Sequence, residues 1–173
     1  HQERLGFLSG ETVFFSETKR HNNFFLSTIM TVLPTATIEL SSAGTEISLL
    51  QYALPYAESL LMFSKLNQMV LRGDEQLTAS SAAIKTATTF ETSLKSKPAT
   101  SGKYVFFAEK RGSHTGIREY FVDSYTNTMD ASQITMHVSK YIAGEAVQLL
   151  ASSNSDILCI RTDDASSENT IWV

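Results

Sequence analysis

Short apolar strands that come in pairs, each joined by a polar turn, constrain this chain more than any other feature. The first pair lies in residues 4–17, RLGFLSGETVFFSE. Leu5 and Phe7 share one face of its first strand, and Val13 and Phe15 share one face of its second, because side chains alternate along a strand. The intervening Ser-Gly-Glu supplies the turn, so the sequence predicts a β-hairpin.

Similar pairs recur along the chain. They define four units, near residues 4–25, 48–91, 103–142 and 146–173. The first strands of the hairpins begin near Leu5, Leu60, Tyr104 and Ile157. The intervals are roughly 55, 44 and 53 residues, near the ~40 to 50 residues of a propeller blade. The prediction is an all-β fold, best described as a partial β-propeller, with a β-sandwich as the alternative.

Two local expectations accompany this fold. The hairpin at 103–124 is predicted to turn through a seven-residue loop, KRGSHTG. Residues 130–142 hold the best helix candidate, and Asp130 or Ser132 could cap a short turn there. Its apolar residues spaced for one helical face are Ile134, Val138 and Tyr141. At most one or two short helices are therefore expected.

Composition limits the partners. The net charge is -4 over 173 residues, which argues against a dedicated nucleic-acid binder because such proteins need a basic face. No apolar run reaches the ~18 residues needed to cross a bilayer. Both ends of the sequence resemble the middle of an ordered region, so we expect a piece of a longer polypeptide.

A search for reactive constellations predicts no catalytic, cofactor-binding or metal-binding residues. The histidines, His1, His21, His114 and His137, lack metal-ligand spacing. Cys159 lies in an apolar strand and is expected to be inert.

Glycoside hydrolysis needs two carboxylates that face each other across the substrate. The candidate carboxylates are Asp163, Asp164, Glu168, Glu11, Glu17, Asp74, Glu75, Glu109 and Asp123. Tyrosines that could stack on sugars are Tyr52, Tyr56, Tyr120 and Tyr125. For both groups, ordinary turn solvation and packing is the stronger interpretation.

Basic residues cluster in two predicted loops. The clusters are Lys19-Arg20-His21 and Lys110-Arg111. They are interpreted as solvated loop charge, with contact to an acidic surface of a neighbouring subunit as the alternative.

Several stretches resemble the tail nozzle proteins of short-tailed bacteriophages, also called tail tubular protein B. In 4–25 the matching residues are Arg4, Leu5, Phe7, Ser9, Gly10, Val13, Ser16, Asn23, Phe24 and Phe25. In 48–79 they are Leu49, Leu50, Tyr52, Ala53, Pro55, Tyr56, Glu58, Leu60, Leu61, Phe63, Ser64, Gln68, Val70, Leu71, Gly73 and Asp74. The likeness covers most of the chain and is weakest after about residue 145.

This resemblance implies a structural role in the virion tail. Members of that family form a sixfold ring below an adaptor ring, contain a β-propeller, surround the channel through which genomic DNA leaves, and offer docking surface for tail fibres. It implies a homohexamer without enzymatic activity or cofactor. A glycan-binding or polysaccharide-degrading tail protein is the alternative, since phage tails often carry such activities.

Overall fold

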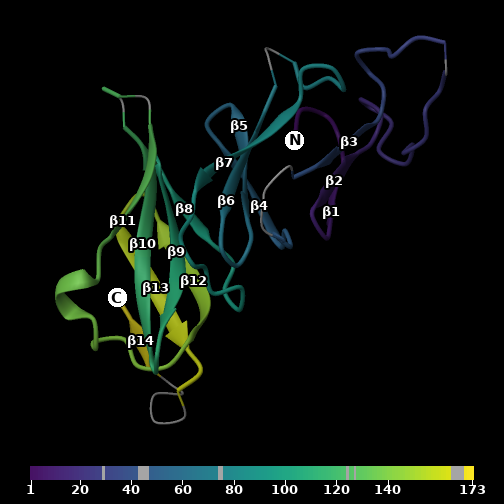
Figure 1. The fold of residues 1–173 in the computed structure, drawn as a ribbon. Coiled ribbons are helices and arrows are strands. Elements are labelled where there is room, and N and C mark those ends of the chain that lie inside the picture. Colours follow the sequence, from purple (N-terminus) through teal and green to yellow (C-terminus); the bar gives the residue numbers. More distant parts are fainter. Residues whose placement is uncertain (29, 43–46, 74–75, 124, 127, 165–169) are drawn as a thin grey trace. The chain divides into compact units, whose positions relative to one another are not determined.

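The computed structural model describes residues 1–28, 30–42, 47–73, 76–123, 125–126, 128–164 and 170–173. Their regular secondary structure is antiparallel β-strand, apart from one 3₁₀ turn, η1, at Met136–Val138 (Figure 1). The predicted all-β class is therefore confirmed.

The described strands form four sheets, and every sheet is built from strands that follow one another in sequence. The first sheet contains β1 (Gly6–Ser9), β2 (Thr12–Phe15) and β3 (Ile38–Ser41). The second contains β4 (Tyr52–Tyr56), β5 (Ser59–Phe63), β6 (Gln68–Arg72) and β7 (Ala83–Thr88). The third contains β8 (Ala99–Ser101), β9 (Tyr104–Arg111), β10 (His114–Val122) and β11 (Met129–Gln133). The fourth contains β12 (Ala146–Ser152), β13 (Ile157–Thr162) and β14 (Ile171–Trp172). Each sheet is thus a meander.

The four sheets start at nearly constant intervals. Their first strands begin at Gly6, Tyr52, Ala99 and Ala146, which are 46, 47 and 47 residues apart. The intervals predicted from the sequence were less even, because they were counted between hairpins that occupy different positions in their sheets. Leu5 leads into the first strand of its sheet, whereas Leu60, Tyr104 and Ile157 belong to second strands.

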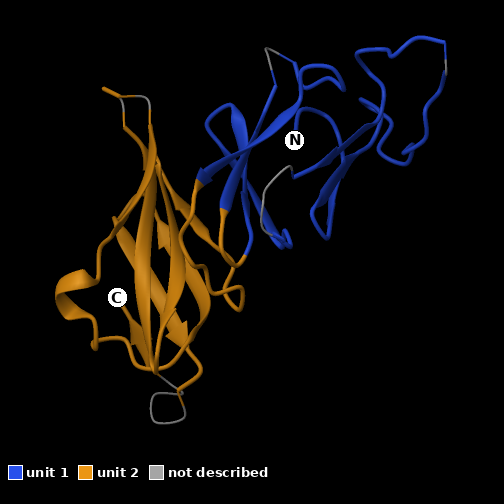
Figure 2. Cartoon of the chain, viewed as in Figure 1, with its two compact units in different colours: residues 1–64, 68–87 blue, residues 65–67, 88–173 orange. Residues whose placement is uncertain are grey.

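The chain divides into two compact units (Figure 2). One comprises residues 1–64 and 68–87, and contains the first two sheets. The other comprises residues 65–67 and 88–173, and contains the third and fourth sheets. Each unit therefore has a pair of sheets and a core of its own.

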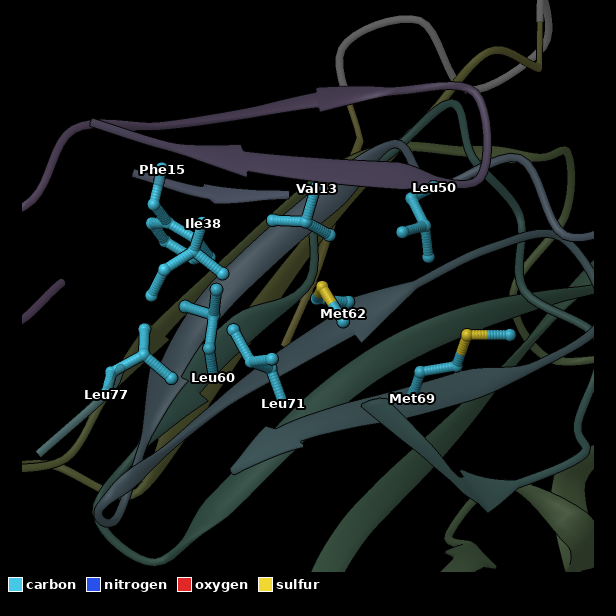
Figure 3. Packing of buried hydrophobic residues seen from close by; sticks show 9 residues of the cluster. All are labelled: Val13, Phe15, Ile38, Leu50, Leu60, Met62, Met69, Leu71 and Leu77. Carbon is cyan, nitrogen blue, oxygen red and sulfur yellow. The ribbon is translucent and has the colours of Figure 1, made fainter. Parts of the chain in front are cut away.

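The core of the first unit lies between its two sheets (Figure 3). The buried side chains of this cluster are Val13, Phe15, Ile38, Leu50, Leu60, Met62, Met69, Leu71 and Leu77. Val13 and Phe15 come from β2 and face residues of β5 and β6. Complete burial of one such side chain stabilises the fold by about 1.5–3 kcal/mol, so this contact fixes the pairing of the sheets.

The second unit repeats this arrangement with smaller side chains. Its buried cluster contains Ala108, Ile117, Ile142, Ala146, Leu149 and Ile160. These residues come from β9, β10, β12, β13 and the connection that precedes β12. Alanines on β9 and β12 permit close packing of the two sheets.

Four hairpins share one type of tight turn. The closing pairs are Ser9↔Thr12, Tyr56↔Ser59, Ser101↔Tyr104 and Arg111↔His114, each leaving two central residues. The first central residue has positive φ in all four: Gly10 (60°), Ala57 (49°), Gly102 (55°) and Gly112 (62°). A positive φ at this position alone is typical of the type II′ turn, whose twist matches that of the strands. Alanine at residue 57 is the exception, since glycine is favoured there.

Two local predictions were wrong for related reasons. The loop KRGSHTG is a two-residue turn, because Gly112 lets β9 run to Arg111 and β10 start at His114. The helix expected at 130–142 is absent apart from the short η1 turn. Asp130 and Ser132, its proposed caps, instead pair with Phe121 and Glu119 of β10, so ladder formation overrides local helix propensity.

Ala57→Gly should stabilise the protein by about 1 kcal/mol, because a left-handed backbone costs an L-residue roughly 1–2 kcal/mol. Urea unfolding measures the change. Ala53→Gly in β4 is the matched control and should destabilise, since glycine weakens a strand interior. A lower stability for the residue 57 variant would contradict the assigned strain.

Candidate interaction surfaces

The longest connection of the first unit, residues 16–37 between β2 and β3, is fastened at its base by Arg4. The guanidinium of Arg4 is almost fully buried and donates to backbone carbonyls. Its acceptors are Ser16 O (2.7 Å), Pro34 O (2.9 Å), Thr35 O (3.4 Å) and Ala36 O (2.6 Å). Burial lowers the pKa of Arg4, but guanidinium stays charged at neutral pH. One side chain therefore joins the two ends of the connection.

A second fastening lies just beyond this base. The carboxylate of Glu17 accepts hydrogen bonds from Asn23 Nδ2 (2.7 Å) and Ser27 Oγ (3.3 Å) and lies 3.6 Å from Arg20 Nη1. The bond from Asn23 is the main reason that the pKa of Glu17 is lowered. Phe24 packs against Phe7 of β1, with ring centroids 5.3 Å apart. The first part of the connection is thus held to its own sheet.

Beyond these fastenings the connection presents apolar side chains to solvent. Phe25 is 82% exposed and Met30 is 93% exposed. The other large apolar side chains exposed here are Leu26, Val32 and Leu33. We call residues 24–33, of which 29 lies outside the described residues, the apolar loop. A group of this kind marks an interaction surface more often than isolated exposed side chains do.

A network of charges occupies the second unit. Lys95 Nζ lies 2.8 Å from Asp163 Oδ2 and 3.0 Å from Glu145 Oε2, and Lys110 Nζ is 3.2 Å from the same oxygen of Glu145. Ser93 Oγ donates to Glu145 Oε1 at 2.7 Å. Two further bonds join the acidic residues directly: Glu145 N–H donates to the side-chain Oδ1 of Asp163 (2.8 Å), and Asp163 N–H donates to the backbone carbonyl of Glu145 (3.0 Å).

These contacts shift the acid–base equilibria in a consistent direction. Burial acts to raise the pKa of Glu145, but hydrogen bonds from Ser93, Lys95 and Lys110 outweigh it and lower that pKa. The hydrogen bond from Lys95 lowers the pKa of Asp163. The bonds to Asp163 and Glu145 raise the pKa of Lys95. The network therefore stabilises the charged forms of Lys95, Glu145 and Asp163 and holds their segments together within the second unit.

The remaining candidate carboxylates also have structural partners where they are described. Glu109 binds the guanidinium groups of Arg111 and Arg118, and its carboxylate lies over Gly116, where a Cβ would approach within 2.7 Å. Glu11 accepts from Ser48 N–H, and Asp123 from Tyr125 N–H. Asp74, Glu75 and Glu168 lie outside the described residues.

The other expected residues are scattered. Tyr120 is buried, Tyr125 is fully exposed, and Tyr52 and Tyr56 lie on β4. Cys159 is half-buried in β13. Among the described residues, His, Cys, Asp and Glu side chains form no group of three able to hold a metal. In the same part of the chain, no helix is long and apolar enough to span a bilayer.

The basic clusters contact carboxylates of their own units. Lys19 lies 3.6 Å from Glu3, and Arg20 the same distance from Glu17. Lys110 and Arg111 contact Glu145 and Glu109, respectively. Much of their charge is therefore neutralised locally.

One hollow in the structure was not predicted from the sequence. It has a volume of about 500 Å³, lies within the second unit, and is lined in part by Tyr104, Phe106, Glu119, Lys103 and Asp156. Burial raises the pKa of Glu119. Tyr104 and Phe106 alternate along β9, a spacing visible in the sequence, but the carboxylates come from β10 and from the turn after β12, which only the fold brings near.

Comparison with known proteins identifies the family. The sequence profile described as "Bacteriophage nozzle protein" matches residues 1–173. The chain belongs to the bacteriophage nozzle protein family. It is 31% identical over 160 residues to the tail tubular protein gp12 of Escherichia phage T7, a match covering 92% of this chain and 20% of that protein. The nozzle chain thus spans about a fifth of this relative's length. It is a structural component of the phage virion tail, as the resemblance implied.

Arg4→Met should lower the free energy of unfolding by about 2 kcal/mol, because buried carbonyls lose a charged donor. Hydrogen exchange should rise in residues 16–37 in particular. Arg20→Met, at an exposed site, is the matched control and should change stability by less than about 0.5 kcal/mol. Equal protection of the connection in both variants would contradict the role of Arg4.

Lys95→Met should lower the melting temperature at pH 7, because two carboxylates lose their cation. The difference from the unmodified protein should shrink as the pH falls below about 4. The pKa values of Glu145 and Asp163 are lower in the folded state, so the stability that they contribute is present at neutral pH and lost in acid. Thermal melting at pH 7 and pH 3 measures this, with Lys97→Met on the same segment as control. A difference independent of pH would argue against the network.

Proposed function

We propose that this chain forms a β-propeller segment of a nozzle ring that surrounds the DNA-exit channel of the phage tail. The observation that carries the proposal is the regular series of meander sheets, whose first strands begin 46, 47 and 47 residues apart at Gly6, Tyr52, Ala99 and Ala146. Propellers consist of repeated antiparallel sheets of about this length. Family membership supplies the setting.

The sheet topology favours propeller blades over sandwiches. Sandwiches of the immunoglobulin kind use Greek-key connections, in which the chain passes from one sheet to the other and back. The chain described here completes each sheet before it begins the next. Successive blades of a propeller pack face to face, as the two sheets of each unit do.

A structural role without chemistry agrees with the use of the charged residues. Glu17, Glu109, Glu145 and Asp163 each stabilise a connection or a sheet. The net charge of -4 would let DNA pass with little attraction. A β-propeller with variable loops suits lateral packing in a homohexamer, contact with a tail adaptor protein and docking of tail fibres.

Glycan binding is the second candidate, favoured by the hollow beside β9. Tyr104 and Phe106 offer aromatic surface there, and Glu119 and Asp156 offer acceptors for sugar hydroxyls. Saturable binding of one glycan class that disappears with Tyr104→Ala would favour this function. Release of new reducing ends from a polysaccharide would extend it to hydrolysis.

The full-length protein should form closed rings with a central channel, because members of a cyclic assembly bury matching surfaces. Electron microscopy of the purified protein, together with mass photometry, should detect a sixfold ring. DNA added at physiological salt should be retained weakly. Monomers at micromolar concentration, or an open filament, would overturn the proposed ring.

A further inference from the structure

The hollow beside β9 lies at the margin of the core between the third and fourth sheets. Phe106 of β9 and Leu158 of β13 line it and also pack against that core. The turn at residues 153–156, between β12 and β13, contributes the rest of one wall. Its volume of about 500 Å³ falls within the range of roughly 300–1,000 Å³ that small-molecule sites occupy.

Two aromatic rings form one side of this hollow. Tyr104 and Phe106 are both half-buried, and their ring centroids lie 6.5 Å apart. They share a face of β9 because side chains two residues apart on a strand point the same way. Lys103 Nζ lies 5.1 Å from the centroid of the Tyr104 ring, a contact that shows the attraction of such a ring for a cation.

Glu119 brings a carboxylate to the same hollow. It stands directly opposite Phe106 in the β9–β10 ladder and is half-buried. Burial raises its pKa, and the charge of Lys103 only partly opposes this shift. Within the part of the chain that the structure describes, no group donates a hydrogen bond to this carboxylate. A partly desolvated carboxylate in this state gains most from a ligand that brings a charged donor.

The lining as a whole favours a cation over an anion. Its charged residues are Glu119, Asp156 and Lys103, so two carboxylates face one ammonium group and the balance is one negative charge. Opposite charge attracts a ligand and like charge repels it, and the effect is greater at a half-buried site than in open water.

The shape of the lining favours a ring over a slender chain. Two aromatic faces can stack on the apolar face of a sugar, and the hydroxyl groups of Ser101 and Ser153 lie within reach of its substituents. A single lysine side chain from a partner would leave most of the 500 Å³ unfilled.

We propose that the hollow beside β9 binds a glycan that carries free amino groups, with one ammonium group on Glu119 and its sugar ring against Tyr104 or Phe106. This inference rests on the glycan-binding function proposed for the same hollow, and it names the class of sugar. An N-acetylated sugar offers the same ring for stacking but lacks the charged donor. An acidic sugar brings a charge of the wrong sign.

Calorimetric titration of the full-length protein with two matched ligands tests the proposal. One ligand is the hexamer of glucosamine, and the other is the hexamer of N-acetylglucosamine, both at about pH 6. The glucosamine hexamer should bind at least about tenfold more tightly, because hydrogen bonds to charged groups are stronger than those between neutral groups. Equal affinities would overturn the inference and leave glycan binding standing. Saturable binding of neither hexamer, nor of any other glycan, would overturn both.

Glu119→Gln separates the carboxylate from the shape of the hollow. The preference for the glucosamine hexamer should fall below about threefold, while the affinity for the acetylated hexamer stays the same. The melting temperature should not fall, because burial disfavours the charged form of Glu119. The matched control is Glu39→Gln, at an exposed carboxylate of β3, and it should keep the full preference. A preference that survives Glu119→Gln would overturn the inference.

Two further ligands identify other occupants. Spermidine carries ammonium groups without a sugar ring, and polysialic acid is a glycan with carboxylates. Spermidine that binds as tightly as the glucosamine hexamer would mean that the hollow recognises a cation alone. Tighter binding of polysialic acid would mean that the net negative charge of the lining does not select the ligand. Either result overturns the inference.

Discussion

Burial of one face of a sheet against the other sheet of the same unit is the constraint on which the rest of this structure depends. A sheet with one apolar face must bury that face against another element. Val13 and Phe15 of the first sheet lie in one buried cluster with Met62 and Leu71 of the second, and the third and fourth sheets likewise share a buried cluster. The repeat of about 47 residues follows from this requirement, because every sheet must present a similar apolar face at a similar position.

Polar side chains hold in place the connections that lie outside the sheets. The connection between β2 and β3 is too long to be fixed by its ladder, and Arg4 fixes it instead through carbonyls at both of its ends. In the second unit Glu145 and Lys95 tie the connection before β12 to the segment before β8. The contact between Glu145 and Lys95 depends on pH, whereas the bonds of Arg4 to carbonyls and the apolar cores do not, so acid should loosen the connection before β12 before it separates the sheets.

Hairpins could be predicted from the sequence because their signals are local. Alternating Leu5 and Phe7, and a glycine at the first turn position, determine a hairpin within about a dozen residues. The helix expected at 130–142 failed because its apolar spacing is ambiguous over so short a stretch, and pairing with β10 decided the outcome. Arg4 was marked by the family resemblance, but nothing in the sequence indicated its bonds to backbone carbonyls. Its acceptors are backbone carbonyls about 12 and 30 residues away, and such acceptors exist at every position of every sequence.

Charged side chains and exposed apolar side chains contribute differently to the contacts that such a protein can make. Many of its carboxylates and cations are paired within their own unit, as Glu109 is with Arg118 and Glu17 with Arg20. Paired charges attract distant partners weakly, because their fields largely cancel beyond a Debye length. Contacts of this chain then depend on shape and apolar area, which act only at short range. Because Arg4 bonds carbonyls at both ends of the connection, the base of the apolar loop is positioned by its own unit.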